Sequence, residues 1–167
     1  MAVEDLKPPD IHRVLAASGW IDLGDHAEAN AELEQVHPSL QGHPEVLKVR
    51  WGIFAASRKW PEAVDLARRL RHLAPNDSFG SIHTAFALHE MKRTQEAFDV
   101  LFPAVERFPK CETIPYNLAC YTAQLGNLDE ARTWLRKAIE VGHPRQIKSM
   151  ALDDPDLQPL WSEIADF

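Results

Sequence analysis

Histidine, cysteine and acidic side chains near the middle of the chain are the residues that could support catalysis or metal binding. His83, His89 and Glu90 fall in one predicted helix, and His83 and Glu90 share a face. A zinc-binding helix usually carries two histidines four residues apart, and the sequence has no such pair. Cys120 has no basic neighbour in the sequence that would activate it as a nucleophile. The sequence therefore predicts no metal, no cofactor and no enzymatic activity.

Recurring acidic residues mark helix starts rather than a catalytic centre. Glu-Ala pairs repeat with a constant step of 34 residues, at Glu28-Ala29, Glu62-Ala63, Glu96-Ala97 and Glu130-Ala131. The helix dipole favours negative charge at a helix N-terminus, which explains the glutamates. A further column with the same step is Leu33, Ala67, Leu101 and Leu135. A 34-residue period kept four times predicts four helical repeats.

Within each repeat the apolar spacing predicts two helices. From Ala29, apolar side chains recur at Leu33 and Val36, and steps of four and three share one helix face. The predicted pairs are 10–22/26–38, 45–57/61–73, 78–91/95–108 and 114–125/128–141. Pro103 lies inside one predicted helix and should kink it, because proline lacks the backbone N–H.

The turn between the two helices differs among repeats. In repeats one and four, Asp25 and Asn127 stand three residues before a glutamate, which is the spacing of a capping box. A glycine precedes each of these caps and suits the turn. Repeats two and three carry Lys59 and Arg93 in the cap position, so their second helices should begin differently.

These columns resemble the tetratricopeptide repeat (TPR) family, whose 34-residue helix–turn–helix motif has small residues at the Ala29, Ala63, Ala97 and Ala131 positions. Segment 116–131 matches it best, whereas Arg50 and Trp51 depart from the usual Leu-Gly of repeat two. The likeness covers about residues 10–143 and indicates a stand-alone, bacterial-type TPR protein. It implies an all-α solenoid, a right-handed superhelix whose concave groove is lined by the first helix of each repeat.

The expected organisation begins with a flexible leader at 1–9 and ends with a C-terminal cap at 144–167. The four repeats between them are 10–43, 44–77, 78–111 and 112–143. A cap is expected because no single helix pair can bury its apolar face alone. Its candidate apolar residues are Ile147, Met150, Leu152, Leu157, Leu160 and Trp161.

Composition narrows the functional classes. The 167 residues are 45% hydrophobic and 26% charged, which is typical of a globular protein. A formal charge of −7 argues against nucleic acid and anionic membranes as partners. No basic leader followed by an apolar run is recognisable, and Cys111 and Cys120 form no disulfide framework. We therefore expect a cytoplasmic protein with reduced thiols.

The candidate partner site is the inner face of the first helices. Its residues are Lys48, Phe79, Ile82, His83, Phe86, His89, Tyr116, Asn117, Cys120 and Gln124. Phe79, Ile82 and Phe86 form an apolar stripe on one face of their helix. The stripe has two interpretations: it fills gaps between neighbouring helices, or it is exposed and anchors a partner.

The leading hypothesis is a protein–protein interaction adaptor that binds a peptide or helical segment in the groove of repeats two to four. The basic clamp of chaperone-tail binders is absent, since Lys48 is followed at four residues by Gly52 rather than Asn. The alternative is a secretion-type TPR chaperone that holds an effector or subunit. A metalloprotein or enzyme using the groove histidines ranks below both, and self-association is a further alternative.

Overall fold

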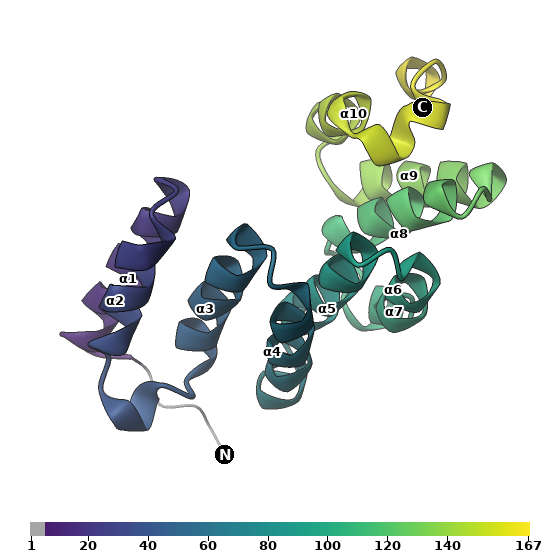
Figure 1. The fold of residues 1–167 in the computed structure, drawn as a ribbon. Helices are drawn as coiled ribbons and strands as arrows, with labels where there is room; N and C mark the ends of the chain where they lie inside the picture. The colour runs from purple at the N-terminus through teal and green to yellow at the C-terminus, as the bar shows by residue number, and fades with distance from the viewer. Residues whose placement is uncertain (1–5) are drawn as a thin grey trace. The chain divides into compact units, whose positions relative to one another are not determined.

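The computed structural model describes residues 6–167, and all regular secondary structure among them is helical (Figure 1). The predicted leader at 1–9 falls mainly on residues 1–5, which lie outside the described part. The chain divides into two compact units, Met1–Gly80 and Ser81–Phe167, which are described separately below. Among the described helices, none has both the length and the apolar character needed to cross a bilayer.

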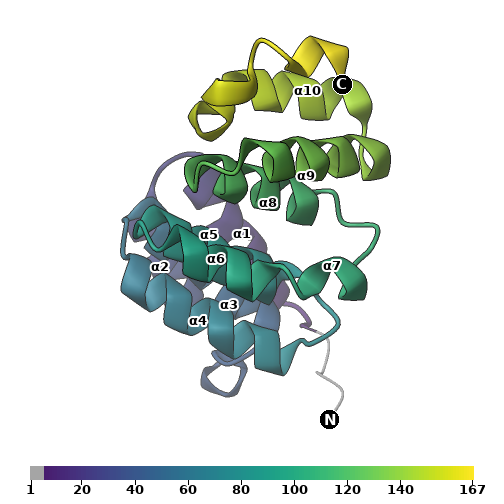
Figure 2. The ribbon, with the colours of Figure 1, turned by 90° about the vertical axis from the view of Figure 1, so that its right-hand side faces the viewer.

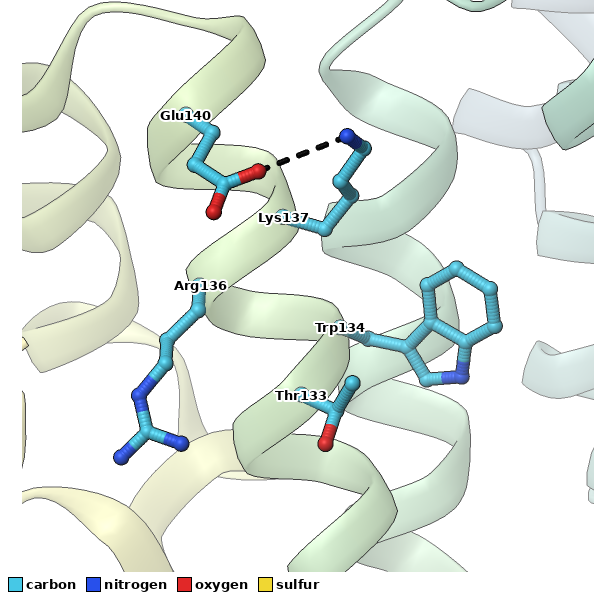
Figure 3. A pocket seen from close by; sticks show the side chains of 5 residues that line it. All are labelled: Thr133, Trp134, Arg136, Lys137 and Glu140. Atoms are coloured by element: carbon cyan, nitrogen blue, oxygen red, sulfur yellow. Dashed lines mark hydrogen bonds and ion pairs between the residues drawn. The ribbon is translucent and has the colours of Figure 1, made fainter.

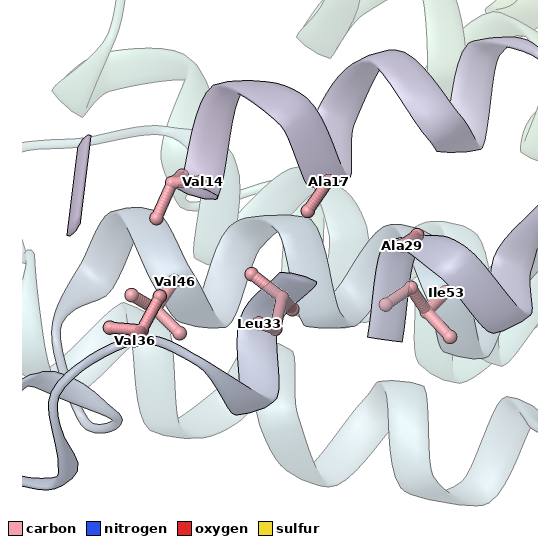
Figure 4. Close-up of a cluster of buried hydrophobic side chains, with 7 residues drawn as sticks. All are labelled: Val14, Ala17, Ala29, Leu33, Val36, Val46 and Ile53. Carbon is pink, nitrogen blue, oxygen red and sulfur yellow. The ribbon is translucent and has the colours of Figure 1, made fainter. Parts of the chain in front are cut away.

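The first unit is built from two helix pairs. Its elements are α1 (Asp10–Asp22), α2 (His26–Glu34), the 3-10 helix η1 (Pro38–Leu40), α3 (Pro44–Ala56) and α4 (Trp60–Leu73). Helix α1 packs on α2 and α3 packs on α4, while α3 also contacts both helices of the first pair. Their shared core comprises Val14, Ala17, Ala29, Leu33, Val36, Val46 and Ile53 (Figure 4). Ala17 and Ala29 are completely buried, and their small side chains let helices approach closely.

The second unit begins within α5 and ends in a set of short C-terminal helices (Figure 2). Its elements are α5 (Phe79–Glu90), α6 (Thr94–Leu101), α7 (Ala104–Arg107), α8 (Thr113–Gln124), α9 (Leu128–Val141), α10 (Pro144–Asp153), η2 (Pro155–Leu160) and η3 (Ile164–Asp166). Helix α8 packs against both α6 and α9. Helix α10 then lies on α9, and η2 lies on α8.

Two prolines decide where second helices end. The predicted helix 95–108 is divided at Pro103, since α6 ends at Leu101 and α7 starts at Ala104, so the predicted kink is confirmed. The predicted helix 26–38 is too long, because α2 ends at Glu34. There Pro38 cannot donate a helical hydrogen bond, and it starts η1 instead.

The turn inside every repeat uses the same backbone conformation. Gly24, Arg58, Lys92 and Gly126 all have positive φ, at 80°, 55°, 61° and 83°. These positions follow one another with the 34-residue step. In each turn the next N–H bonds the carbonyl five residues earlier, as in Asp25 to Trp20 at 2.8 Å and Arg93 to Leu88 at 3.0 Å. This closure is the Schellman motif, so one turn type is repeated four times.

The C-terminal helices bury a different set of side chains from the one expected. Leu157, Leu160 and Ile164 are completely buried. Met150 and Leu152, which we expected to cover repeat four, are 45% and 46% exposed, so this part of the expectation is wrong. The reason is helical spacing, because the buried face of α10 is formed by Ile147 and Ala151.

Candidate functional site

A cavity of about 310 Å³ lies entirely within the second unit. Helices α5 and α8 form two of its walls, and the start of η2 forms the third. The lining residues are Phe86, His89, Glu90, Asn117, Cys120, Tyr121, Asp154, Pro155 and Asp156. Aromatic, thiol, imidazole and carboxylate groups are thus gathered from three separate segments.

Two aspartates attach the C-terminal segment to this cavity. Asp154 Oδ2 accepts hydrogen bonds from the Tyr116 hydroxyl at 2.9 Å and from Cys120 Sγ at 3.5 Å. Asp156 Oδ2 lies 2.9 Å from His89 Nε2. Gln124 also donates to the Asp156 backbone carbonyl, at 3.1 Å. Three predicted groove residues of α8 therefore contact the chain's own C-terminal segment.

Local sequence explains why both carboxylates face the same way. Helix α10 ends at Asp153, and Asp154 caps η2 by accepting the Asp156 N–H on Oδ1 at 3.0 Å. Pro155 occupies the first position of η2, where its missing N–H costs nothing. The tight turn places Asp154 and Asp156 on either side of Pro155.

The cavity is electrostatically negative. None of its described lining residues is Lys or Arg, whereas Glu90, Asp154 and Asp156 carry carboxylates. Burial raises the pKa of the Cys120 thiol well above its usual value, and the charges of Asp154 and Asp156 raise it further. Cys120 is therefore a protonated thiol at neutral pH in this arrangement and does not have the character of an activated nucleophile.

One polar atom in the cavity wall is unsatisfied. Among the described residues, none forms a hydrogen bond with the Tyr121 hydroxyl, although Tyr121 is only 2% exposed. The Asn117 side chain lies nearby but does not meet hydrogen-bond geometry. Burial raises the pKa of Tyr121, so the hydroxyl stays neutral. Buried hydroxyls are normally bonded, so this wall has an unused donor and acceptor.

The predicted groove residues of the first unit, Lys48 and Phe79, form ion pairs and ring contacts within that unit. Lys48 Nζ pairs with Glu45 at 2.7 Å and with Asp77 at 2.6 Å. It also lies 5.7 Å from the centre of the Phe79 ring, which packs edge-on against Trp51. Lys48 and Phe79 thus belong to one local cluster.

Part of the apolar stripe is buried between helices, and part of it is exposed. Ile82 is buried and His83 is partly buried, whereas Phe86 is 38% exposed at the cavity. Asn117 is partly buried beside it. Whether these residues bind a partner stays a prediction.

The sequence did not indicate Asp154 and Asp156 as site residues. One usable signal was present, since Asp154 follows Cys120 by 34 residues and so continues a repeat column. Spacing along the predicted helices alone did not place these two aspartates, because the C-terminal segment returns to α8 outside the periodic helices.

A second hollow, on α9, has no comparable convergence (Figure 3). It is lined by Thr133, Trp134, Arg136, Lys137 and Glu140, all from one helix. Lys137 Nζ pairs with Glu140 at 3.4 Å, whereas Arg136 lies over the Phe167 ring. In Figure 3 the Trp134 and Arg136 side chains point to opposite sides of the helix. The cavity at α8 is therefore the stronger candidate.

Comparisons with known proteins bear on the fold. No family model matches the chain, and no curated protein matches it in sequence. Among solved structures, a thermophilic TPR protein from Thermus thermophilus, TTC0263, is 15% identical, with a TM-score of 0.69 over 95% of this chain and 100% of that chain. MamA from Desulfovibrio magneticus RS-1 is 16% identical, with a TM-score of 0.68 over 97% and 96%. Together with the 34-residue period, the likeness identifies this chain as an all-α solenoid of the tetratricopeptide repeat fold.

Proposed function

We propose that the protein is an interaction adaptor that binds a peptide or helical segment of another protein. The binding surface is the face of α5 and α8 around Phe86 and Asn117. The carrying observation is that Phe86 stays 38% exposed at the rim of a cavity while its neighbours on α5 are largely buried. Partly exposed aromatic side chains beside a hollow are typical anchors in protein interfaces.

The surroundings of Phe86 support a peptide ligand. The Asn117 side chain offers both a donor and an acceptor for main-chain groups, and Glu90 adds a carboxylate at the same rim. Helices that are already folded lose little conformational freedom on binding, so most of the ordering cost falls on the ligand. Apolar contact with Phe86 then supplies affinity, and the polar rim supplies orientation.

The test compares two aromatic positions that are both exposed. Phe86→Glu should reduce the affinity for a partner by about tenfold or more, because a central anchor is lost. Phe102→Glu is the matched control, since Phe102 is 49% exposed but does not line the cavity. Partners are captured from the native host, identified, and then titrated as purified proteins against both variants.

Circular dichroism must show equal helical content for the two variants. If the purified partner binds Phe86→Glu as tightly as the unmodified protein, the assigned surface is wrong. Equal losses with both variants would likewise contradict a specific site at Phe86.

A further inference from the structure

We propose that His89, Cys120, Asp154 and Asp156 form a binding site for a zinc-type transition metal ion, which fastens the C-terminal segment to α5 and α8. The proposal is independent of partner binding at Phe86. It joins four potential ligands of three chemical kinds, from the last turn of α5, the middle of α8 and the start of η2.

Three of the four proposed ligands have donor atoms close to one another, and the fourth, His89, contacts one of them. Metal–ligand bonds of about 2.0–2.3 Å in a tetrahedron place neighbouring ligand atoms roughly 3.3–3.8 Å apart. Cys120 Sγ and Asp154 Oδ2 are already 3.5 Å apart, and His89 Nε2 and Asp156 Oδ2 are 2.9 Å apart. Donor atoms of Cys120, Asp154 and Asp156 all lie within 4.8 Å of one another. His89 Nε2 lies outside this group of three and contacts only Asp156 among its members, so the imidazole must shift toward Cys120 Sγ and Asp154 Oδ2 to become the fourth ligand.

The donor set favours one class of metal. A thiolate together with an imidazole is preferred by zinc and similar transition ions, whereas Ca²⁺ and Mg²⁺ prefer oxygen ligands alone. Two carboxylates complete four ligands without any ligand from another molecule. The expected ion is therefore Zn²⁺, with Co²⁺ as a spectroscopic substitute.

Residues behind the ligands hold them in place. His89 Nδ1 lies 3.0 Å from Thr94 Oγ1, so the second ring nitrogen has a partner and Nε2 is directed at the site. The Tyr116 hydroxyl donates to Asp154 Oδ2, which fixes that carboxylate. Hydrogen bonds of this kind commonly orient metal-binding histidines and carboxylates.

The charges and the unsatisfied hydroxyl fit a bound cation. When the Nδ1 hydrogen is donated to Thr94, the Nε2 lone pair faces the Asp156 carboxylate, and a cation between them removes the repulsion. Binding of M²⁺ releases the proton of Cys120 and forms a metal–sulfur bond, which leaves a net charge of −1 on the ion and its three anionic ligands. The Tyr121 hydroxyl on the same wall would then bond a water held by the metal-bound carboxylates, outside the four ligands.

The alternative is a purely hydrogen-bonded attachment. In that state Nε2–H donates to Asp156, and Cys120 keeps its proton and donates to Asp154. The two states differ in whether the Cys120 sulfur is a thiolate bound to metal, and this difference can be measured directly.

The experiment uses the full chain after EDTA treatment and dialysis. Titration with Co²⁺ should give a thiolate-to-cobalt charge-transfer band and the visible bands of a tetrahedral ion, saturating at one equivalent. Zn²⁺ should abolish both by displacement and should raise the thermal unfolding temperature. Cys120→Ser should remove the charge-transfer band and weaken Zn²⁺ binding by at least about tenfold. Cys111→Ser, which changes the only other cysteine, should leave both unchanged.

A second variant guards against a folding defect in Cys120→Ser. Asp156→Asn should keep the charge-transfer band but weaken Zn²⁺ binding by about tenfold or more, with unchanged helical content. If no charge-transfer band appears at one equivalent, or if Cys111→Ser removes it, the metal site is disproved. The hydrogen-bonded attachment then remains as the description of this contact.

Discussion

The turns of the outer repeats and those of the inner repeats reach the same conformation from different sequences. In repeats one and four a glycine takes the positive φ, and the next residue caps the second helix, as Asp25 does for the Glu28 N–H at 3.0 Å. In repeats two and three the positive φ falls on Arg58 and Lys92. Their cap positions, Lys59 and Arg93, form no side-chain cap hydrogen bond in the structure.

Because turns with and without glycine and a side-chain cap have the same conformation, we infer that burial of the helices, and not the turn sequence, determines how the two helices of a repeat are arranged. A residue with a side chain costs roughly 1–2 kcal/mol in the left-handed region, and a missing cap costs about 1 kcal/mol more. The inner repeats tolerate both. Their second helices are held instead by completely buried side chains such as Ala63, Ala67 and Leu101.

The largest effect is expected when the C-terminal segment that packs on repeat four is removed. Repeat four has both the glycine turn and the side-chain cap, so its local sequence is favourable. Deleting residues 152–167 should destabilise the protein by several kcal/mol, at about 2 kcal/mol for each large side chain that loses its burial. Leu157, Leu160 and Ile164 are all completely buried and would be removed. Urea denaturation followed by circular dichroism, in the presence of EDTA, measures the loss without any contribution from metal.

The control for this deletion is Leu152→Ala, because Leu152 is 46% exposed in the same part of the chain. Its effect should stay within about 0.5 kcal/mol. If the truncated protein unfolded at the same urea concentration as the full chain, the local turn and cap of repeat four would suffice, and the conclusion would be reversed.

A smaller effect is expected from Gly126→Ala. Gly126 has a φ of +83°, and a Cβ there would meet no atom within 4 Å, so the cost is purely conformational. The free energy of unfolding should fall by about 1 kcal/mol. Gly19→Ala is the matched control, because Gly19 lies inside α1 with equally open space. Gly19→Ala should stabilise the protein by about 0.5–1 kcal/mol. If Gly19→Ala and Gly126→Ala both destabilised the protein, the cause would be steric rather than conformational.

The smallest effect is the reverse change in an inner repeat. Lys92→Gly should stabilise the protein by about 0.5 kcal/mol, because relief of the left-handed conformation exceeds the entropy lost by glycine on folding. Thermal unfolding of the variant beside the unmodified protein would detect the shift. A lower unfolding temperature would mean that the Lys92 side chain makes stabilising contacts that outweigh its backbone cost.

The sequence predicted most of the fold because the repeat is local. A constant step of 34 residues placed both helices of each repeat, and Pro103 indicated the break between α6 and α7. The end of α2 was misplaced, since the apolar spacing continues to Val36 while the backbone already leaves the helix at Gln35. Such an ending depends on Pro38 and on η1 rather than on the apolar pattern.

The cavity was predicted only in part, for a physical reason. Phe86, Asn117 and Cys120 lie on predicted helices, and helical spacing placed each of them on the inner face of its helix. Asp154 and Asp156 follow the last regular helix, and their position depends on η2 packing against α8. A contact of that kind is long in sequence and has no period, so residue spacing alone cannot place it.

The packing of η2 on α8 also covers the fourth repeat with residues of the same chain. Asp154 stands one repeat step beyond Cys120, so the tail takes the place that the first helix of a fifth repeat would occupy. A further helix, from this chain or from another molecule, could take the place of η2 on α8 only after η2 had left that surface.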